Sequence, residues 1–131
     1  MTAISKKPSN YTLLLQAYEG IDSKKMQELM LATQQNKNFF AEILHISPKT
    51  FDRYIKEGKK FNPTESEKIL KLEQVYDWGK EVFGNVETFN EWIEIPAYGL
   101  DDRIPKSMMQ TYGGLFLVED ELIRIAYGAL A

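Results

Sequence analysis

The residues from Lys37 to Lys56, KNFFAEILHISPKTFDRYIK, constrain the fold more than any other stretch of the chain. Apolar residues recur at helical spacing on both sides of a short break, at Phe40, Ala41, Leu44, Ile46, Phe51 and Tyr54. Ser47 and Pro48 form a strong helix start, because a serine hydroxyl accepts from an unpaired backbone N–H and proline needs no donor in the first turn. The small side chain of Ala41 lets two helices cross closely. The pattern therefore predicts two short helices joined by a tight turn, as in a helix-turn-helix.

The second of these helices is predicted to turn a cationic face to solvent. With its apolar residues inward, the outer positions on and after it are Lys49, Thr50, Asp52, Arg53, Lys56, Lys59 and Lys60. Such a face can contact phosphates and base edges in the major groove of DNA. The turn residue is His45 where glycine is common, and histidine tolerates a left-handed backbone at some cost. A helical hairpin that only packs in a small domain would show the same pattern, so both interpretations stay open.

Composition excludes several classes of protein. The chain has 131 residues and 44% hydrophobic content, enough for one compact domain or two small subdomains. It has no cysteine and one histidine, which excludes disulfides and leaves little room for zinc, and we expect no metal or cofactor. No apolar run is long enough to span a bilayer, and Met1 to Ser9 lacks the apolar segment of a signal peptide. We expect a soluble, cytoplasmic protein without a membrane contact.

Charge is distributed unevenly along the chain. Residues 1–60 hold ten Lys and Arg against six Asp and Glu, a net charge of +4, whereas residues 61–131 hold six against 13, a net charge of −7. The basic part contains the predicted helix-turn-helix. This asymmetry is typical of a protein whose first part meets phosphate and whose second part meets another surface, although an ordinary solvated surface could also produce it.

Around the central pair, the pattern predicts further helices. The run YTLLLQAYE after Asn10 is either a short helix capped by Asn10 or a strand, and a helix capped by Ser23 is expected to brace the pair. Asn62, Pro63 and Glu65 are a cap, a first-turn proline and a capping-box acid, and predict a long helix to about Phe83. The remaining elements are a short helix at Val86–Ile93, an ordered loop at Glu94–Pro105, and a final helical region from Pro105, interrupted near Gly113 and Gly114. The predicted fold class is all-α.

The final helix carries two apolar stripes. One is expected to face the core and consists of Leu115, Val118, Leu122, Ile125 and Ala129. The second is displaced by roughly a third of a turn at ~100° per residue and consists of Phe116, Ile123, Tyr127 and Leu130. Either the helix is sandwiched within its own core, or the second stripe binds a partner protein.

Several segments resemble the Xre/MbcA/ParS antitoxin family, the partners of RES-domain toxins. They are HISPKTFDRYIKEGKKFNPTESEKILKL, EVFGN, Trp92, the loop with Pro96, Gly99 and Pro105, and the ending RIAYGALA, and the resemblance covers about Ile21 to Ala131. It implies an Xre-like helix-turn-helix domain at 1–60 that binds operator DNA. It also implies a small helical region at 61–131 that dimerises and blocks the active-site cleft of an NAD-degrading RES-domain toxin, without chemistry of its own.

The resemblance and the patterns together give two sets of candidate site residues. DNA contact is expected at Ser47, Lys49, Thr50, Arg53, Lys56, Lys59 and Lys60. Toxin contact is expected at Asp101, Asp102, Arg103, Phe116, Ile123, Arg124, Tyr127, Leu130 and Ala131. The recognition helix departs from the family by carrying Asp52 and few arginines, which makes operator binding less secure than toxin binding.

Three function classes compete on this sequence. The first is a type II antitoxin that neutralises its toxin and represses its own operon. The second is a stand-alone helix-turn-helix regulator with a C-terminal dimerisation domain. The third, an enzyme, lacks support, since there is no nucleophile elbow, phosphate-binding glycine motif or metal-ligand cluster. We expect a homodimer, because helix-turn-helix proteins read twofold half-sites, and the first candidate for its contact is the aromatic face from Tyr76 to Phe83.

Overall fold

The structure is a computed structural model that describes residues 8–128. Within this range it contains only helices, apart from an isolated bridge between Ala97 and Arg103, and the predicted all-α class is confirmed. The α-helices are α1 (Asn10–Glu19), α2 (Ser23–Thr33), α3 (Lys37–Leu44), α4 (Pro48–Glu57), α5 (Pro63–Phe83), α6 (Val86–Trp92) and α7 (Tyr112–Gly128). Two short 3-10 helices are η1 (Tyr98–Leu100) and η2 (Pro105–Met108). None of the helices in the described range combines the length and the apolar character needed to cross a bilayer.

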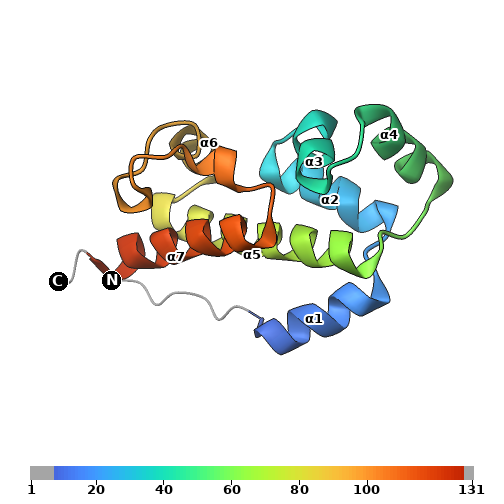
Figure 1. The fold of residues 1–131 in the computed structure, drawn as a ribbon, viewed down its shortest axis with the longest axis horizontal. Coiled ribbons are helices and arrows are strands. Elements are labelled where there is room, and N and C mark those ends of the chain that lie inside the picture. Colours follow the sequence, from blue (N-terminus) through green and yellow to red (C-terminus); the bar gives the residue numbers. More distant parts are fainter. Residues whose placement is uncertain (1–7, 129–131) are drawn as a thin grey trace.

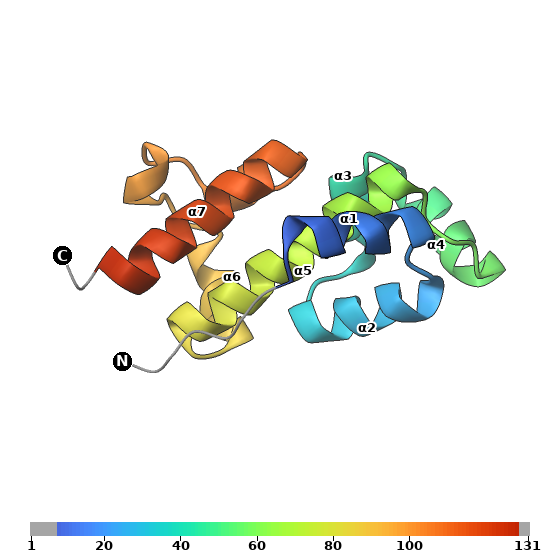
Figure 2. The ribbon, with the colours of Figure 1, turned by 90° about the horizontal axis from the view of Figure 1, so that it is seen from below.

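The long helix α5 runs through the middle of the molecule (Figure 1). It packs most extensively against α7 and α1, and also contacts α6 and α3. Figure 2 shows α7 and α1 along α5, with α2, α3 and α4 grouped around its N-terminal end. The start of α5 follows the predicted capping box: Asn62 Oδ1 accepts from the Glu65 N–H at 2.8 Å, and Glu65 Oε1 accepts from the Asn62 N–H at 3.0 Å. One continuous apolar core surrounds α5 and joins the N-terminal and C-terminal helices.

The N-cap residues of the first two helices lie one position earlier in the chain than the sequence suggested. Residues 10–19 form a helix and not a strand, and its cap is Ser9, whose hydroxyl accepts from the Thr12 N–H at 3.1 Å, in place of Asn10. The cap of α2 is Asp22, whose carboxylate accepts from the Lys25 N–H at 2.8 Å, in place of Ser23. Both corrections have the same cause, because two neighbouring residues could each cap and only backbone geometry selects one.

The pair α3 and α4 has the predicted arrangement of two short helices and a tight turn. His45 ends α3 in the left-handed conformation with φ of 58°. The Ser47 hydroxyl accepts from the Thr50 N–H at 3.0 Å and starts α4, with Pro48 in its first turn. Ala41 is 1% exposed, as expected at a close helix crossing. The local sequence signals therefore place both ends of this turn.

The helical region that begins at Pro105 is interrupted, as predicted, but slightly before Gly113 and Gly114. The interruption falls at residues 109–111, between η2 and α7, and both glycines lie within α7. The Gly114 N–H donates to the hydroxyl oxygen of Thr111 at 2.9 Å. A Cβ on Gly114 would lie 1.7 Å from the carbonyl oxygen of Met108. Glycine at 114 therefore permits a close backbone approach and does not end a helix.

Candidate functional site

The first candidate surface is the outer face of α4. Lys49, Arg53 and Lys56 occur at i, i+4 and i+7, so their side chains share one face of the helix, and all three are exposed. Within residues 8–128, Lys49 and Lys56 form no ion pair. Thr50 is half-buried, and the Ser47 hydroxyl is occupied by the cap of α4. The structure thus brings the predicted DNA-contact residues together, with Ser47 in a structural role as well.

Aromatic rings fix the orientation of this face. Phe51 is 1% exposed, and its ring centroid lies 6.4 Å from that of Phe40 and 6.4 Å from that of Phe61. The guanidinium of Arg53 and the ammonium of Lys59 lie 5.9 Å and 4.6 Å from the centroid of the Tyr54 ring. Cation–π contact therefore holds these two cations at the surface of α4. Lys60 is exposed at the start of the link to α5.

Asp52, the acid that departs from the expected recognition helix, is paired across the hairpin. Its carboxylate lies 2.8 Å from the ammonium of Lys37 at the start of α3, and both side chains are about half exposed. The pair offsets the negative charge of Asp52 within the basic region. Water and salt screen an exposed pair of this kind, so its contribution to folding is small.

The second candidate surface combines α7 with the loop that contains η1, residues 94–105, which is called the η1 loop below. The Arg124 guanidinium donates to the carbonyl oxygen of Gly99 at 3.1 Å, to Glu121 Oε1 at 3.0 Å, and to the carboxylate of Asp120. These carboxylates raise the pKa of Arg124 above its ordinary value, led by the hydrogen bond to Glu121. A Cβ on Gly99 would lie 2.0 Å from Glu121 Oε1, so a larger residue at 99 would require the Glu121 carboxylate to move. Arg124 therefore ties the loop to the helix.

A tight turn projects Asp101 and Asp102 from this loop. Both residues have left-handed backbones, with φ of 55° and 60°, a conformation that aspartate adopts more readily than most residues. The Ala97 carbonyl oxygen accepts from the N–H groups of Leu100 and Asp102, each at 3.0 Å. Asp101, Asp102 and Arg103 are all exposed. The loop is thus ordered by its own backbone hydrogen bonds, as expected for the segment from Glu94 to Pro105.

The predicted partner-facing stripe of α7 is open where the structure describes it. Phe116 is 48% and Tyr127 46% exposed, and Ile123 is half-buried. Leu130 and Ala131, also predicted to contact the toxin, lie outside the described residues. In the core stripe, Leu115, Val118 and Leu122 are fully buried, Ile125 is 36% exposed, and Ala129 is outside the described range. Of the described members of the second stripe, Phe116 and Tyr127 are therefore open to solvent and not sandwiched in the chain's own core.

Two features of this part of the molecule were not predicted from the sequence. Tyr98, at the tip of the η1 loop, is 94% exposed, and Leu117 on α7 is 47% exposed. For Tyr98, the only signal in the sequence was its position in a loop, between Pro96 and Gly99. The second feature is the Lys71 ammonium, which is 2.7 Å from Glu119 Oε1 in the α5–α7 interface and only 2% exposed. Its position between two leucines of an apolar helix indicated burial, but no local pattern named its partner.

The two surfaces are connected through Gln110, immediately before α7. Its carbonyl oxygen accepts from His45 Nε2 at 2.9 Å and from the Lys68 ammonium at 3.2 Å. Its side-chain amide donates to Glu42 at 2.6 Å. Burial lowers the pKa of Lys68, with Glu65 acting in the opposite direction. The turn between α3 and α4 is therefore attached to the start of α7.

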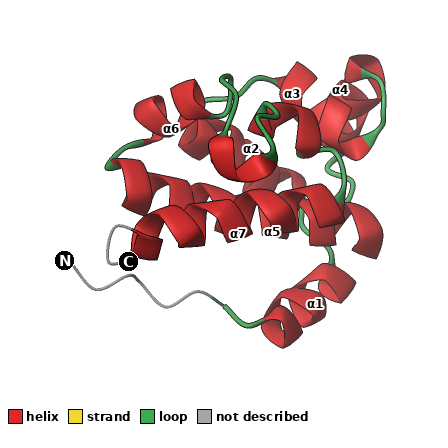
Figure 3. Ribbon diagram, turned by 60° about the vertical axis from the view of Figure 1, so that its left-hand side comes forward, coloured by secondary structure: helices red, strands yellow, loops and turns green. Residues whose placement is uncertain are grey.

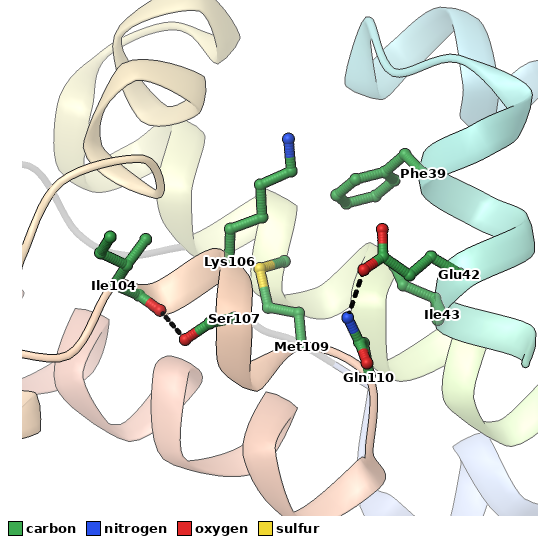
Figure 4. Close-up of a pocket in the computed structure, with 8 residues that line it drawn as sticks. All are labelled: Phe39, Glu42, Ile43, Ile104, Lys106, Ser107, Met109 and Gln110. Atoms are coloured by element: carbon green, nitrogen blue, oxygen red, sulfur yellow. Dashed lines mark hydrogen bonds between the residues drawn. The ribbon is translucent and has the colours of Figure 1, made fainter.

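A shallow pocket of about 320 Å³ lies beside this connection (Figure 4). Its lining residues come from α3 and from the segment 104–110: Phe39, Glu42, Ile43, Ile104, Lys106, Ser107, Met109 and Gln110. Glu42 and Gln110 are already hydrogen-bonded to each other, and Lys106 is paired with Glu94 at 3.0 Å. Within residues 8–128, no group of three or more His, Cys, Asp or Glu side chains is placed to hold a metal ion. Glu42, Gln110 and Lys106 in the pocket wall therefore already have partners within the chain.

Comparison with known proteins matches the second surface to a family. Residues 79–128 match the antitoxin Xre/MbcA/ParS C-terminal toxin-binding domain. The chain is also similar to a protein named antitoxin Xre from Yersinia enterocolitica serotype O:8 / biotype 1B, with 30% identity over 95 residues. The matched region is 70% of this chain and 64% of that relative, so the chain spans less than two thirds of the relative's length. The family resemblance seen in the sequence is confirmed.

Proposed function

We propose that this chain, which belongs to the Xre/MbcA/ParS antitoxin family through its C-terminal domain, is a type II antitoxin. It binds and neutralises a cognate toxin of the RES-domain class by covering the cleft in which that toxin degrades NAD. It acts by obstruction and catalyses no reaction itself. Both proposed partners, operator DNA and a toxin that consumes NAD, favour the cytoplasm as its location.

The observation that carries this proposal is the combination of a tied loop and an open apolar face in residues 79–128. Arg124 fixes the η1 loop on α7, while Phe116 and Tyr127 remain nearly half exposed on the same helix. Exposed aromatic side chains on a rigid support are the usual anchors of protein interfaces. The loop adds the charges of Asp101, Asp102 and Arg103 at the rim. Such a surface suits binding to a preformed protein cleft.

Co-expression with the neighbouring toxin gene tests the toxin half of the proposal. The chain should restore growth and cellular NAD, and the double variant Phe116→Ala/Tyr127→Ala should lose this protection. Leu31→Ala is the control, because Leu31 is 81% exposed on α2, outside the matched domain. Removing all of α7 is a poor test, since Leu115, Val118 and Leu122 belong to the core. Full protection by the double variant would refute the assigned surface.

We further propose that α4 binds operator DNA and represses the antitoxin operon. Arg53→Ala and Lys56→Ala should each weaken binding, and each should reduce the salt dependence by about one phosphate contact. Lys80→Ala removes an equal charge at the far end of α5 and serves as the control. Fluorescence anisotropy with the promoter fragment at several salt concentrations measures both quantities. Unchanged affinity in both α4 variants would contradict the proposal.

A further inference from the structure

Helix α1 presents a large apolar stripe to solvent. Tyr11, Leu14, Leu15 and Tyr18 are 71%, 39%, 49% and 68% exposed. They lie at i, i+3, i+4 and i+7 and therefore on one face of the helix. The opposite face is used for packing on α5, since Leu13 and Ala17 are only 2% and 1% exposed. A helix with two apolar faces, of which only one is covered by its own chain, indicates a partner.

The position of α1 separates this stripe from the proposed DNA-binding face. Figures 1 and 3 show α1 on the side of α5 away from α3 and α4. It also lies outside residues 79–128, the part that matches a toxin-binding domain. The α1 stripe therefore lies away from the proposed DNA-binding face (Figure 1) and outside the part of the chain that matches the toxin-binding domain.

The order of the four residues points to a second copy of this chain. The stripe reads Tyr–x–x–Leu–Leu–x–x–Tyr, which is the same in both directions about the midpoint between Leu14 and Leu15. In an antiparallel pair of identical helices related by a twofold axis at that midpoint, Tyr11 of each copy meets Tyr18 of the other. Leu14 likewise meets Leu15. We propose that α1 forms an antiparallel twofold contact with α1 of a second copy.

Charge is consistent with this self-pairing. Residues 10–18 contain no charged side chain, so two copies of the stripe meet without repulsion between like charges. The single charge of the helix is Glu19 in its last turn. Antiparallel pairing brings each Glu19 toward the N-terminal end of the other helix, where unpaired N–H groups favour a negative charge. A parallel pair would place the two Glu19 carboxylates side by side.

The available area is also suitable. Two tyrosines that are about 70% exposed offer roughly 280 Å² per copy, at the 150–250 Å² that an aromatic side chain can bury. Both copies together give about half of the ~1,000 Å² that a specific interface needs. The exposed parts of Leu14 and Leu15 and the flanking polar residues of α1 add to this area. The contact thus approaches the lower limit for a specific interface.

The aromatic face from Tyr76 to Phe83, the first candidate for the dimer contact, is largely engaged within the chain. Tyr76 is 2% exposed, its hydroxyl donates to Asn90 Oδ1 at 2.7 Å, and burial raises its pKa. The Phe83 ring packs on Phe89 and Trp92, with centroids 6.2 Å and 5.5 Å away. Tyr76 in particular serves the α5–α6 interface and is not available to a second copy.

The mass of the isolated full-length chain tests the proposal without toxin or DNA, so its outcome does not depend on the proposed function. Sedimentation equilibrium should give twice the chain mass of 15.2 kDa for the wild type and for Leu31→Glu. Leu14→Glu/Leu15→Glu should give the single-chain mass with an unchanged circular dichroism spectrum, because both leucines are partly exposed. Leu31→Glu is the control, since it makes the same kind of substitution, with one added charge in place of two, at an exposed leucine on α2.

Cysteine cross-linking tests the antiparallel register. The chain has no native cysteine, so each introduced thiol is unique. Under mild oxidation, a mixture of Tyr11→Cys and Tyr18→Cys chains should form the mixed disulfide in preference to either homodimer, and Leu31→Cys should remain uncross-linked. A wild-type monomer, a dimer that survives Leu14→Glu/Leu15→Glu, or loss of toxin binding alone in that variant would each overturn the proposal. Preferred Tyr11–Tyr11 cross-linking would overturn the antiparallel arrangement.

Discussion

Gly113 and Gly114 are neighbours in the first turns of α7, yet their surroundings differ. A Cβ on Gly113 meets nothing within 4 Å, whereas a Cβ on Gly114 would lie 1.7 Å from a backbone oxygen of Met108. We expect Gly114→Ala to lower the free energy of unfolding by ~1–3 kcal/mol, because a backbone atom must move. Gly113→Ala should be neutral or more stable by up to ~1 kcal/mol, since alanine favours helix. Urea denaturation compares the two, and equal stability would contradict the close approach.

The buried pair of Lys71 and Glu119 makes a second prediction for individual residues. Lys71→Met or Glu119→Leu alone leaves one charge buried without its partner and should cost about 3–5 kcal/mol. The double variant Lys71→Met/Glu119→Leu should recover most of this loss, because two apolar side chains fill the same interface. A double-mutant cycle from urea denaturation measures the coupling. Additive losses in the double variant would show that the two charges act independently.

Sequence signals at this scale were reliable where both partners are close along the chain. Asn62 and Glu65 are three residues apart, so their capping box could be predicted. Lys71 and Glu119 are 48 residues apart, and only the packing of α7 on α5 brings them together. The role of Gly114 could not be predicted for the same reason, because its contact with Met108 depends on the path of the chain through η2. Non-local contacts of this kind leave no periodic signal.

Among the elements, α4 could be predicted from local sequence signals. Its charge also depends on α3, because Asp52 on α4 is paired with Lys37 on α3. Removal of the Asp52 carboxylate frees Lys37 from its ion pair and leaves Glu57 as the one remaining acid of α4. We expect Asp52→Ala to raise the affinity for operator DNA about fivefold, equivalent to roughly 1 kcal/mol. Its stability should change by less than ~1 kcal/mol, because the ion pair is exposed. Anisotropy titrations should show no gain for the control Glu91→Ala on α6, and an unchanged affinity for Asp52→Ala would place the DNA elsewhere.

The candidate surfaces were predictable from the sequence to different degrees. The α4 face followed from the spacing of Lys49, Arg53 and Lys56, because a helix that buries Phe51 must expose them. The stripe on α7 also followed from periodicity. The α1 stripe did not, because leucines and tyrosines on both faces of a short segment fit a strand or a helix equally. The exposed loop residue Tyr98 has no period at all, and only the folded loop reveals it.

At the scale of the whole molecule, the sequence predicted a boundary at residue 60 between a basic N-terminal part and an acidic C-terminal part. Helix α5 joins these two parts. Its apolar residues belong to one core with residues from α1 to α4 and from α6 and α7. The hydrogen bonds from His45 and Lys68 to Gln110 add a second connection between the two parts. Unfolding of either part therefore exposes core residues of the other, and the two parts should unfold together.

This cooperativity can be measured with the native residues. Both tryptophans, Trp78 and Trp92, lie after residue 60 and report on the C-terminal part by fluorescence. Far-ultraviolet circular dichroism reports on all helices, including α1 to α4. We expect the two urea transitions to coincide in midpoint and slope, because the shared core on α5 is lost in one step. A fluorescence transition at a different urea concentration would mean that residues 1–60 and 61–131 are independent domains, and that contacts along α5 couple them only weakly.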